Sequence, residues 1–319
     1  MTDLQQSGSP AGTVESGVVD APGAATAAIA PGAGAIATAS PPGALSDFWH
    51  RFVRNRLALL GLAMVILVIG VAIFAPLLAP HNPYTQDLRS TLRGPSGAHP
   101  FGTDQNGRDQ LSRVIFGSRI AIEVGLASIF LSLVIGIVMG SVAGYLGRAW
   151  DSVIMRVADV FFAFPLLIGA ILIILVVGRG IGSVILALAI FTWATSARLL
   201  RSSILSVREV EYIEAARSLG SSRWRIVTRH VLPNSLAPVI VYGAVSVGVA
   251  IVAEVALAYL GAGPSANTPD WGNMIAAGQS FLSYKDFMWF FPSMAVVFTV
   301  LGFVFMGDGI RDALDPKLR

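Results

Sequence analysis

The chain has 319 residues, of which 54% are hydrophobic and 13% are charged, and its formal net charge is +3. The hydrophobic share is too high for an ordinary soluble domain, and the small positive charge is not clustered on a soluble segment, which excludes a nucleic-acid-binding protein. The absence of cysteine excludes disulfides, thiolate catalysis and cysteine-ligated metal sites. The four histidines have no metal-ligand spacing, so we expect no metal site.

Residues 1–44 consist mainly of Ala, Gly, Pro, Ser and Thr, with three acidic residues and no basic one. This composition predicts a disordered tail, because it cannot bury enough apolar surface to offset the entropy of ordering. The tail lacks the basic start and apolar core of a secretory signal. We expect a simple spacer, with a docking role as the alternative.

Six apolar runs reach or approach the roughly 20 residues that are needed to cross a bilayer. They lie at residues 57–79, 124–146, 153–177, 180–197, 235–260 and 287–307. The fourth run is the shortest. The pattern predicts an all-α integral membrane protein with six transmembrane helices in one domain, residues 45–319.

The distribution of basic residues predicts the orientation of these spans, because cytoplasmic segments carry an excess of Lys and Arg. With the N-terminus inside, the inner segments contain 15 basic residues and the outer segments contain 7. Six spans place both termini on one side. We therefore expect both termini, and the loop at residues 198–233, to be cytoplasmic.

The largest outer segment, residues 80–118, contains the run Asp104-Gln-Asn-Gly-Arg-Asp109. Its acids lack the spacing of a calcium-binding EF-hand loop. Asn106-Gly107 is typical of a turn, and Asp109 is placed to cap an interfacial helix that leads into the second span. We expect Asp104, Gly107, Arg108 and Asp109 to lie at a contact with a partner protein.

Two carboxylates fall within predicted spans, where ionisable groups are functional candidates by default. Asp159 lies near the cytoplasmic start of the third span and has Arg156 within reach. Glu254 lies deeper, in the fifth span, without a local partner. We expect an end-of-helix ion pair for Asp159, and for Glu254 an interhelical hydrogen bond or a polar group facing the pathway.

Prolines and glycines add expectations about the shape and packing of the spans. Pro165, Pro238 and Pro292 are expected to kink their helices. Gly136, Gly140 and Gly144 form a small-residue face on the second span that is suited to close helix packing.

The loop at residues 198–233 has the pattern of two short helices. Ser206 and Glu209 have the spacing of a capping box, and an apolar stripe follows at Tyr212, Ala215, Ala216 and Leu219. Gly220 then predicts a sharp turn, and a second helix over residues 223–231 is expected to end at Pro233. Glu214 and Arg225 supply charges around the stripe. The residues allow two interpretations, a docking surface for a protein or a helix lying on lipid headgroups.

The run Glu214-Ala215-Ala216, followed by Gly220 and Leu232-Pro233, resembles the EAA loop of ATP-binding-cassette importer permeases. His230 replaces the usual aliphatic residue. Four further segments resemble the C-type subunits of dipeptide, oligopeptide and nickel permeases, so the resemblance covers about residues 46–319. These segments are His99–Arg113, Arg156–Asp159, Glu254 with Tyr259–Gly261, and Asp308–Pro316.

The resemblance implies a non-enzymatic permease subunit in a bacterial plasma membrane that works by alternating access. Its partners would be a sister permease, two ATP-binding subunits that hold ATP and Mg²⁺, an external substrate-binding protein, membrane lipid and a dipeptide or oligopeptide substrate. The residues expected to contact the ATPase are Glu214, Ala215, Ala216, Leu219, Gly220 and Arg225. The external loop with Asp104 and Asp109 would contact the substrate-binding protein or, equally, the sister permease. Neither Lys285 nor Lys317 follows a glycine, so the chain lacks a phosphate-binding loop of its own.

Three alternatives remain open at this point. One is a nickel importer permease of the same family. Another is a self-sufficient secondary transporter, which predicts internal repeats that the sequence does not clearly show. The third is a regulatory scaffold that uses the basic loop to recruit a cytoplasmic protein.

Overall fold

A computed structural model describes residues 44–314. The predicted tail, residues 1–44, therefore lies outside the described residues except for Ala44. Within residues 44–314 the regular elements are helices, and the β-structure consists of an isolated antiparallel bridge between Thr103 and Asp109. The predicted all-α fold is thus confirmed for this part of the chain.

Five helices of the described region are long and apolar enough to cross a bilayer, and a sixth span results if a helix pair bent by 95° counts as one. The five are α2 (Arg56–Ile73), α4 (Gln110–Leu146), α7 (Ile181–Val207), α11 (Ala237–Tyr259) and α13 (Phe287–Leu314). The bent pair consists of α5 (Arg148–Ala163) and α6 (Leu166–Val177).

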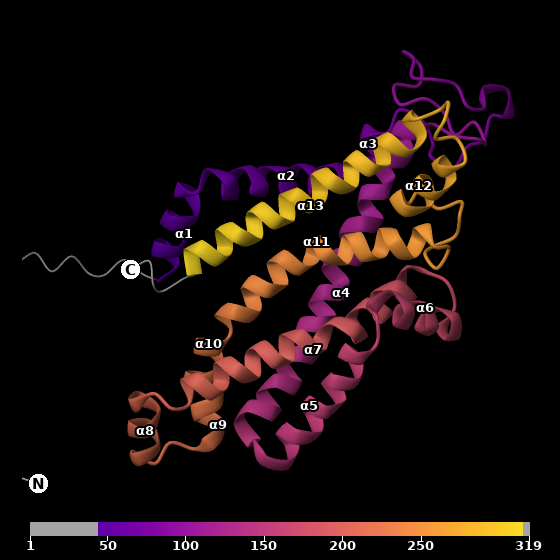
Figure 1. The fold of residues 1–319 in the computed structure, drawn as a ribbon. Coiled ribbons are helices and arrows are strands. Elements are labelled where there is room, and N and C mark those ends of the chain that lie inside the picture. Colours follow the sequence, from indigo (N-terminus) through magenta and orange to yellow (C-terminus); the bar gives the residue numbers. More distant parts are fainter. Residues whose placement is uncertain (1–43, 315–319) are drawn as a thin grey trace, which may run out of the picture. The chain divides into compact units, whose positions relative to one another are not determined.

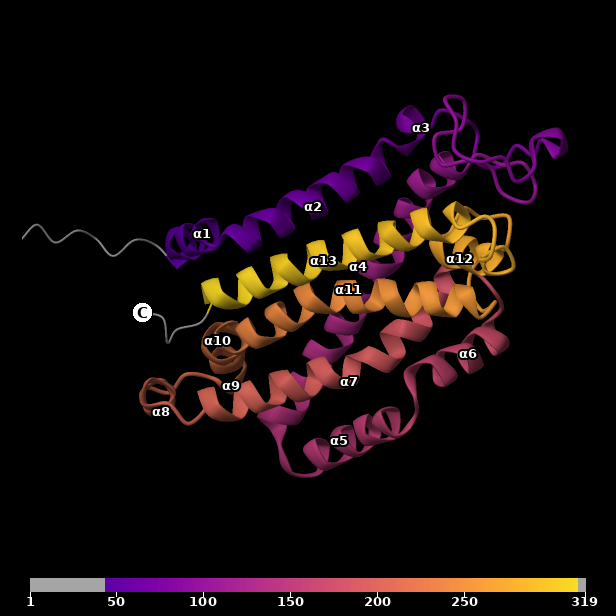
Figure 2. The same ribbon diagram turned by 45° about the horizontal axis from the view of Figure 1, so that its top comes forward.

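Shorter elements lie between and beside the long helices. They are α1 (Ala44–Arg54), α3 (Ala75–Leu78), the 3-10 helix η1 (Leu88–Ser90), α8 (Glu211–Ser218), α9 (Arg223–Ile226), the π-helix η2 (Val227–Val231), α10 (Leu232–Ser235) and α12 (Trp271–Gln279). Figures 1 and 2 show α8 and α9 beyond one end of the long helices, and α12 with the loop between α3 and α4 at the other. We refer to these as the α8 end and the α12 end.

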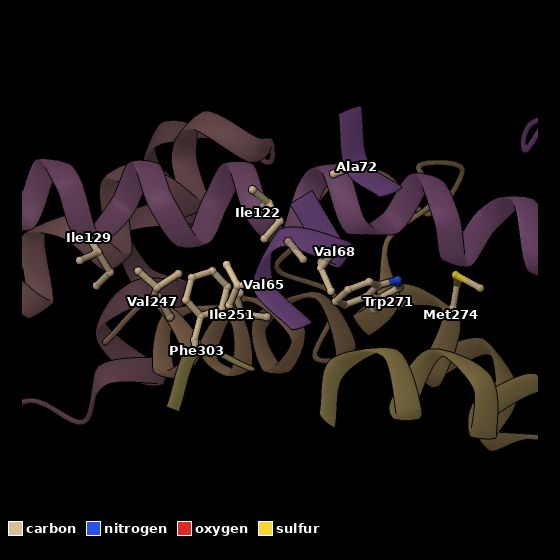
Figure 3. Close-up of a cluster of buried hydrophobic side chains, with 12 residues drawn as sticks. Val65, Val68, Ala72, Ile122, Ile129, Val247, Ile251, Trp271, Met274 and Phe303 are labelled. Carbon is tan, nitrogen blue, oxygen red and sulfur yellow. The ribbon is translucent and has the colours of Figure 1, made fainter. Parts of the chain in front are cut away.

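The largest core joins α2, α4, α11, α12 and α13 (Figure 3). Trp271 of α12 is buried in it, and its indole N–H donates a 2.9 Å hydrogen bond to the Val114 carbonyl of α4. Because the buried indole N–H has a hydrogen-bond partner, Trp271 holds α12 in place against α4. The sequence did not predict α12, which packs against α4, α11 and α13.

Small residues bring α4 and α7 into close contact, as the glycine pattern predicts. A Cβ atom on Gly136 would lie 2.0 Å from the Ser196 hydroxyl oxygen, and a Cβ atom on Gly140 would lie 2.6 Å from the Ala197 carbonyl oxygen. Both distances are shorter than any normal contact. The backbones can therefore approach only because these side chains are absent.

Two helices extend beyond their predicted bounds. α4 begins at Gln110, directly after the Asp109 cap, so the expected interfacial helix and the second span form one helix of 37 residues. α7 continues to Val207, so residues 198–207 of the predicted loop are helical. Leu200 and Ile204 are fully buried there, and their burial favours continuation of the helix.

The predicted capping box is wrong because α7 continues through Ser206. Ser206 lies inside α7, where its hydroxyl donates to the Ser202 carbonyl at 3.3 Å. α8 instead starts after Val210, without a side-chain cap.

The prolines have different effects from those expected of simple kinks. Pro165 lies at the break between α5 and α6. Pro238 lies in the first turn of α11, where backbone N–H groups make no hydrogen bond within the helix, so proline removes none there. Pro292 lies inside α13, which continues past it to Leu314. Pro233 does not end its helix but lies within α10, directly after the wide π-helical turn in which the Leu232 N–H donates to the Val227 carbonyl.

Candidate functional site

The turn between α8 and α9 is built around Gly220, whose φ of 78° lies in the left-handed region. The Ser221 N–H donates to the Ala216 carbonyl at 3.1 Å, and the Gly220 N–H donates to the Arg217 carbonyl at 3.0 Å. This pair of bonds is the Schellman arrangement that closes many helices. The Ser222 hydroxyl oxygen then accepts from the Arg225 N–H at 3.4 Å, which starts the next helix. The predicted glycine turn is confirmed.

α8 and α9 are anchored to the long helices by two isoleucines, Ile213 and Ile226. Both are buried, in a cluster with Leu200 and Ile204 of α7 and Val239 of α11. This buried cluster joins α8 and α9 directly to α7 and α11. The sequence analysis missed Ile213 because it assigned the apolar face to its neighbours, although Ile213 is the one aliphatic residue larger than alanine in α8.

The predicted stripe on α8 faces away from the core. Leu219 is 87% exposed, Trp224 of α9 is 76% exposed, and Tyr212 and Ala215 are also exposed, while Ala216 is half-buried. We call this surface the outer face of α8–α9. Several large apolar side chains exposed together mark an interaction site. Glu214, Gly220 and Arg225 are exposed beside it.

A hollow of about 760 Å³ lies between this unit and the end of α4. Most of its lining residues are polar or charged: Tyr145, Leu146, Arg208, Glu209, Glu214, Arg217, Ser221 and Ile226. The α8 end therefore combines exposed apolar side chains with a polar cavity that carries both signs of charge.

The residues predicted at the other end are buried within the chain. Arg108 Nε donates to Asp104 Oδ2 at 2.6 Å, and Asp104 Oδ1 accepts from the Asn106 and Arg108 N–H groups. Gly107 has a φ of 72°, and a Cβ atom there would lie 1.8 Å from the Asp87 carbonyl oxygen. The turn prediction is confirmed. These side chains hold the loop together, and a contact of this loop with a partner protein stays a prediction.

Asp87, opposite Gly107, starts the helix η1. Its carboxylate accepts from the Ser90 hydroxyl at 2.6 Å and from the Arg89 N–H at 3.0 Å. These hydrogen bonds to the charged form lower the pKa of Asp87.

Arg113 is a structural residue that the sequence analysis did not single out. Its buried guanidinium donates to the carbonyls of Pro83 at 3.1 Å, Asn267 at 3.3 Å and Thr268 at 3.3 Å. The start of α4 is thereby tied to the loops on both sides. An arginine in the first turn of a long apolar helix was the available signal.

The two predicted intramembrane carboxylates lie in different surroundings. Glu254 is buried in the last two turns of α11, next to the carboxyl group of Asp270, which caps α12. Glu254 therefore faces another helix and lies near the α12 end rather than deep in the span. Asp159 pairs with Arg198 of α7 at 2.5 Å, which corrects the expected pairing with Arg156.

Comparison with known proteins identifies the family and the fold. Residues 136–319 match the family described as "Binding-protein-dependent transport system inner membrane component". Residues 43–95 match the N-terminal transmembrane domain of oligopeptide transport permease C. The chain belongs to this permease family. It is a multi-pass membrane subunit of an ATP-binding-cassette transport system, in which ATP hydrolysis belongs to a separate subunit.

Relatives of this permease are similar along most of their length. The glutathione transport system permease protein GsiD of Pectobacterium atrosepticum is 39% identical over 86% of this chain and 91% of its own. The dipeptide transport system permease protein DppC of Alkalihalophilus pseudofirmus is 40% identical, over 86% and 90%. The oligopeptide transport system permease protein OppC of Bacillus subtilis is 39% identical, again over 86% and 90%.

A solved structure supports the permease fold independently. A chain of the MetNI methionine ABC transporter in an inward-facing conformation superimposes with a TM-score of 0.53 at 18% identity, over 64% of this chain and 97% of the other. This likeness confirms the fold of a type I ABC importer permease.

Proposed function

We propose that this permease forms the translocation path of an importer for dipeptides, oligopeptides or similar small peptides. The names of its relatives support this substrate class, since they are permeases for glutathione, dipeptides and oligopeptides. The same names do not favour the nickel alternative. A permease of this family works with other subunits, so a self-sufficient secondary transporter and a regulatory scaffold are also disfavoured.

The observation that carries the coupling part of the proposal is the construction of α8–α9. Ile213 and Ile226 fix the unit to α7 and α11, while Leu219 and Trp224 project outward without cover from the described part of this chain. An ATP-binding subunit that holds the outer face in a cleft would pull directly on two long helices. Glu214, Ala215, Ala216, Gly220 and Arg225 complete the proposed contact.

The remaining assignments follow from the family and from the distribution of charge. The α8 end, with both termini, faces the cytoplasm of a bacterium, and the α12 end faces the external substrate-binding protein. A sister permease completes the path by alternating access, and two ATPase subunits bind ATP and Mg²⁺.

A cross-linking experiment tests the coupling contact, and the cysteine-free sequence removes any background from this chain. Leu219→Cys, combined with single cysteines along the cleft of the ATPase subunit, is expected to form a disulfide in native membranes. Leu88→Cys is the control, because Leu88 is exposed at the α12 end. Equal cross-linking of both variants, or none with Leu219→Cys, would contradict the assignment.

Uptake of labelled di- and tripeptides by the assembled transporter tests the substrate class. ATP-dependent uptake that competes with unlabelled peptide is expected. Uptake of Ni²⁺ without peptide uptake would instead support the nickel alternative. Peptide uptake that persists without any ATPase subunit would support a secondary transporter.

A further inference from the structure

Three potential metal ligands from separate parts of the chain meet at the α12 end. His81 follows α3, His99 lies in the loop before α4, and Asp109 caps α4. His99 Nδ1 lies 2.8 Å from Asp109 Oδ1, and His81 Nδ1 lies 3.7 Å from the same oxygen. One ligand atom from each residue lies within 4.8 Å of the other two. The sequence analysis found no metal spacing because the three residues become neighbours only in the fold.

The carboxylate of Asp109 is held in position for this role. Its side chain is 1% exposed, and Oδ2 accepts from both the N–H and the hydroxyl of Ser112, at 2.8 and 2.7 Å. The Ser112 hydroxyl oxygen also accepts from the His81 N–H at 3.0 Å, which ties the loop of His81 to the same turn. Oδ1 is thus left to face the two imidazoles. Metal sites commonly have ligands oriented by such outer hydrogen bonds.

The two imidazoles form the accessible side of the cluster. Their ring centroids lie 4.8 Å apart, and the side chains of His81 and His99 are 44% and 19% exposed. An ion can therefore enter from solvent and rest against the buried carboxylate. A hydrogen bond between His99 and Asp109 accounts for two of the three residues but gives no role to His81.

We propose that His81, His99 and Asp109 bind a divalent transition-metal ion of the zinc class. Two imidazole nitrogens and one carboxylate oxygen are ligands that zinc prefers. Tetrahedral zinc places its ligand atoms about 3.3 Å apart, so the two distances to Asp109 Oδ1, 2.8 and 3.7 Å, need only small side-chain movements. The three ligand atoms all lie within 4.8 Å of one another, and rotation of the exposed His81 ring brings its nitrogen closer. Water completes the coordination. The bound ion clamps the loop that carries both histidines onto the start of α4.

Each histidine binds the ion through an unprotonated nitrogen, so a ring proton on Nδ1 must move to Nε2 or to solvent. Magnesium is a poor fit, because it prefers oxygen ligands in an octahedral arrangement. The inference concerns this chain alone and does not depend on the proposed importer function.

Zinc titration of the full-length chain, purified with its bound subunits, freed of affinity tags and stripped with EDTA, tests the proposal. After zinc bound by the partner subunits is subtracted, one zinc ion per chain is expected to bind. Binding is also expected to raise the unfolding temperature of the chain. His81→Ala and His99→Ala are each expected to weaken this binding at least about tenfold, in line with losses at known sites. The matched controls are His50→Ala and His230→Ala, outside the cluster.

Several results would overturn the site. One is wild-type protein that binds no additional zinc. Another is zinc affinity that falls as much in the His50 and His230 variants as in the cluster variants. His81→Ala keeps the test valid if His99→Ala disturbs the fold, because His81 is largely exposed. If His81→Ala unfolds at the wild-type temperature without zinc and still shows the full zinc-dependent increase, the proposal is wrong.

Discussion

In and beside α8, Ile213 and Leu219 have opposite surroundings although they belong to the same short segment. Ile213 is fully buried and Leu219 is 87% exposed. The sequence correctly predicted a helix, a glycine turn and a set of small and apolar residues. It could not predict which side faces the core, because one residue more or less in α7 rotates the start of α8 by about 100° around the helix axis.

This difference predicts different effects of truncation. Ile213→Ala should destabilise the α8 end by about 2–5 kcal/mol, because it removes fully buried methyl and methylene groups. Leu219→Ala should change stability by less than about 0.5 kcal/mol but should reduce transport-coupled ATP hydrolysis. Thermal unfolding and ATPase assays separate the two effects. Normal coupling in stable Leu219→Ala protein would argue against the proposed contact.

Gly220 permits a second test at the scale of a single residue. Its φ of 78° strains any L-residue, and no neighbouring atom lies within 4 Å of a Cβ atom there. Gly220→Ala should therefore destabilise by about 1–2 kcal/mol through backbone strain alone. The control is Gly182→Ala in α7, which has equally free space without a positive φ and should be neutral or stabilising. Equal unfolding temperatures for the two variants would contradict the strain argument.

Glu254 depends on its neighbour Asp270 rather than on solvent. Asp270 already accepts the Asn273 N–H through Oδ1. Glutamine can donate a hydrogen bond to the other carboxylate oxygen of Asp270, whereas leucine cannot. We therefore expect Glu254→Gln to fold normally and Glu254→Leu to lose about 1–3 kcal/mol. Unfolding temperatures in detergent measure both. Equal stability of the leucine variant would show that the contact with Asp270 is unimportant.

Among the helices, sequence patterns identified the long apolar elements but not their ends. Asp109 correctly marked the start of a helix. Nothing local showed that this helix would continue without interruption through the predicted second span to form α4. Pro165 marked a break, but the 95° angle between α5 and α6 depends on tertiary packing. α12 was missed because nine residues with two glycines carry little periodic signal, and its burial depends on Trp271.

The close packing of α4 and α7 predicts that single methyl groups are harmful at this contact. Gly140→Ala places a Cβ atom 2.6 Å from the Ala197 carbonyl oxygen and should destabilise by about 1–3 kcal/mol. Gly70→Ala in α2 is the control, because its Cβ atom would have no neighbour within 4 Å. Unfolding temperature and yield of folded protein in the membrane are the measurements. Equal unfolding temperatures and yields for the two variants would mean that α4 and α7 can move apart at little cost.

Across the whole molecule, the two ends differ in how their polar groups are used. At the α12 end Arg113, Arg108 and Asp104 are buried and paired within the chain. At the α8 end many charged side chains are exposed around the outer face. The amino-acid pattern predicted which segments gather at each end, since alternate spans reverse direction. It could not reveal that the side chains of Asp104, Arg108 and Asp109 are buried within the chain.

The proposed orientation predicts the labelling pattern of single cysteines. Leu88→Cys at the α12 end should react with a membrane-impermeant maleimide in cells in which the reagent can reach the outer surface of the inner membrane. Ser218→Cys at the α8 end should react only after the inner membrane is permeabilised. The reverse pattern would overturn the assignment of the termini to the cytoplasm.

The length of α4 has a practical consequence for measuring motion in this transporter. Its 37 residues extend about 55 Å, against a hydrocarbon thickness of about 30 Å, and the helix is packed against α7 without a break. Spin labels near its two ends would therefore keep a constant separation while other helices move. A label on α4 can thus serve as a fixed reference. Distances from it to labels on α8, on the α5–α6 bend and on α13 would report the displacement of each during the ATP cycle.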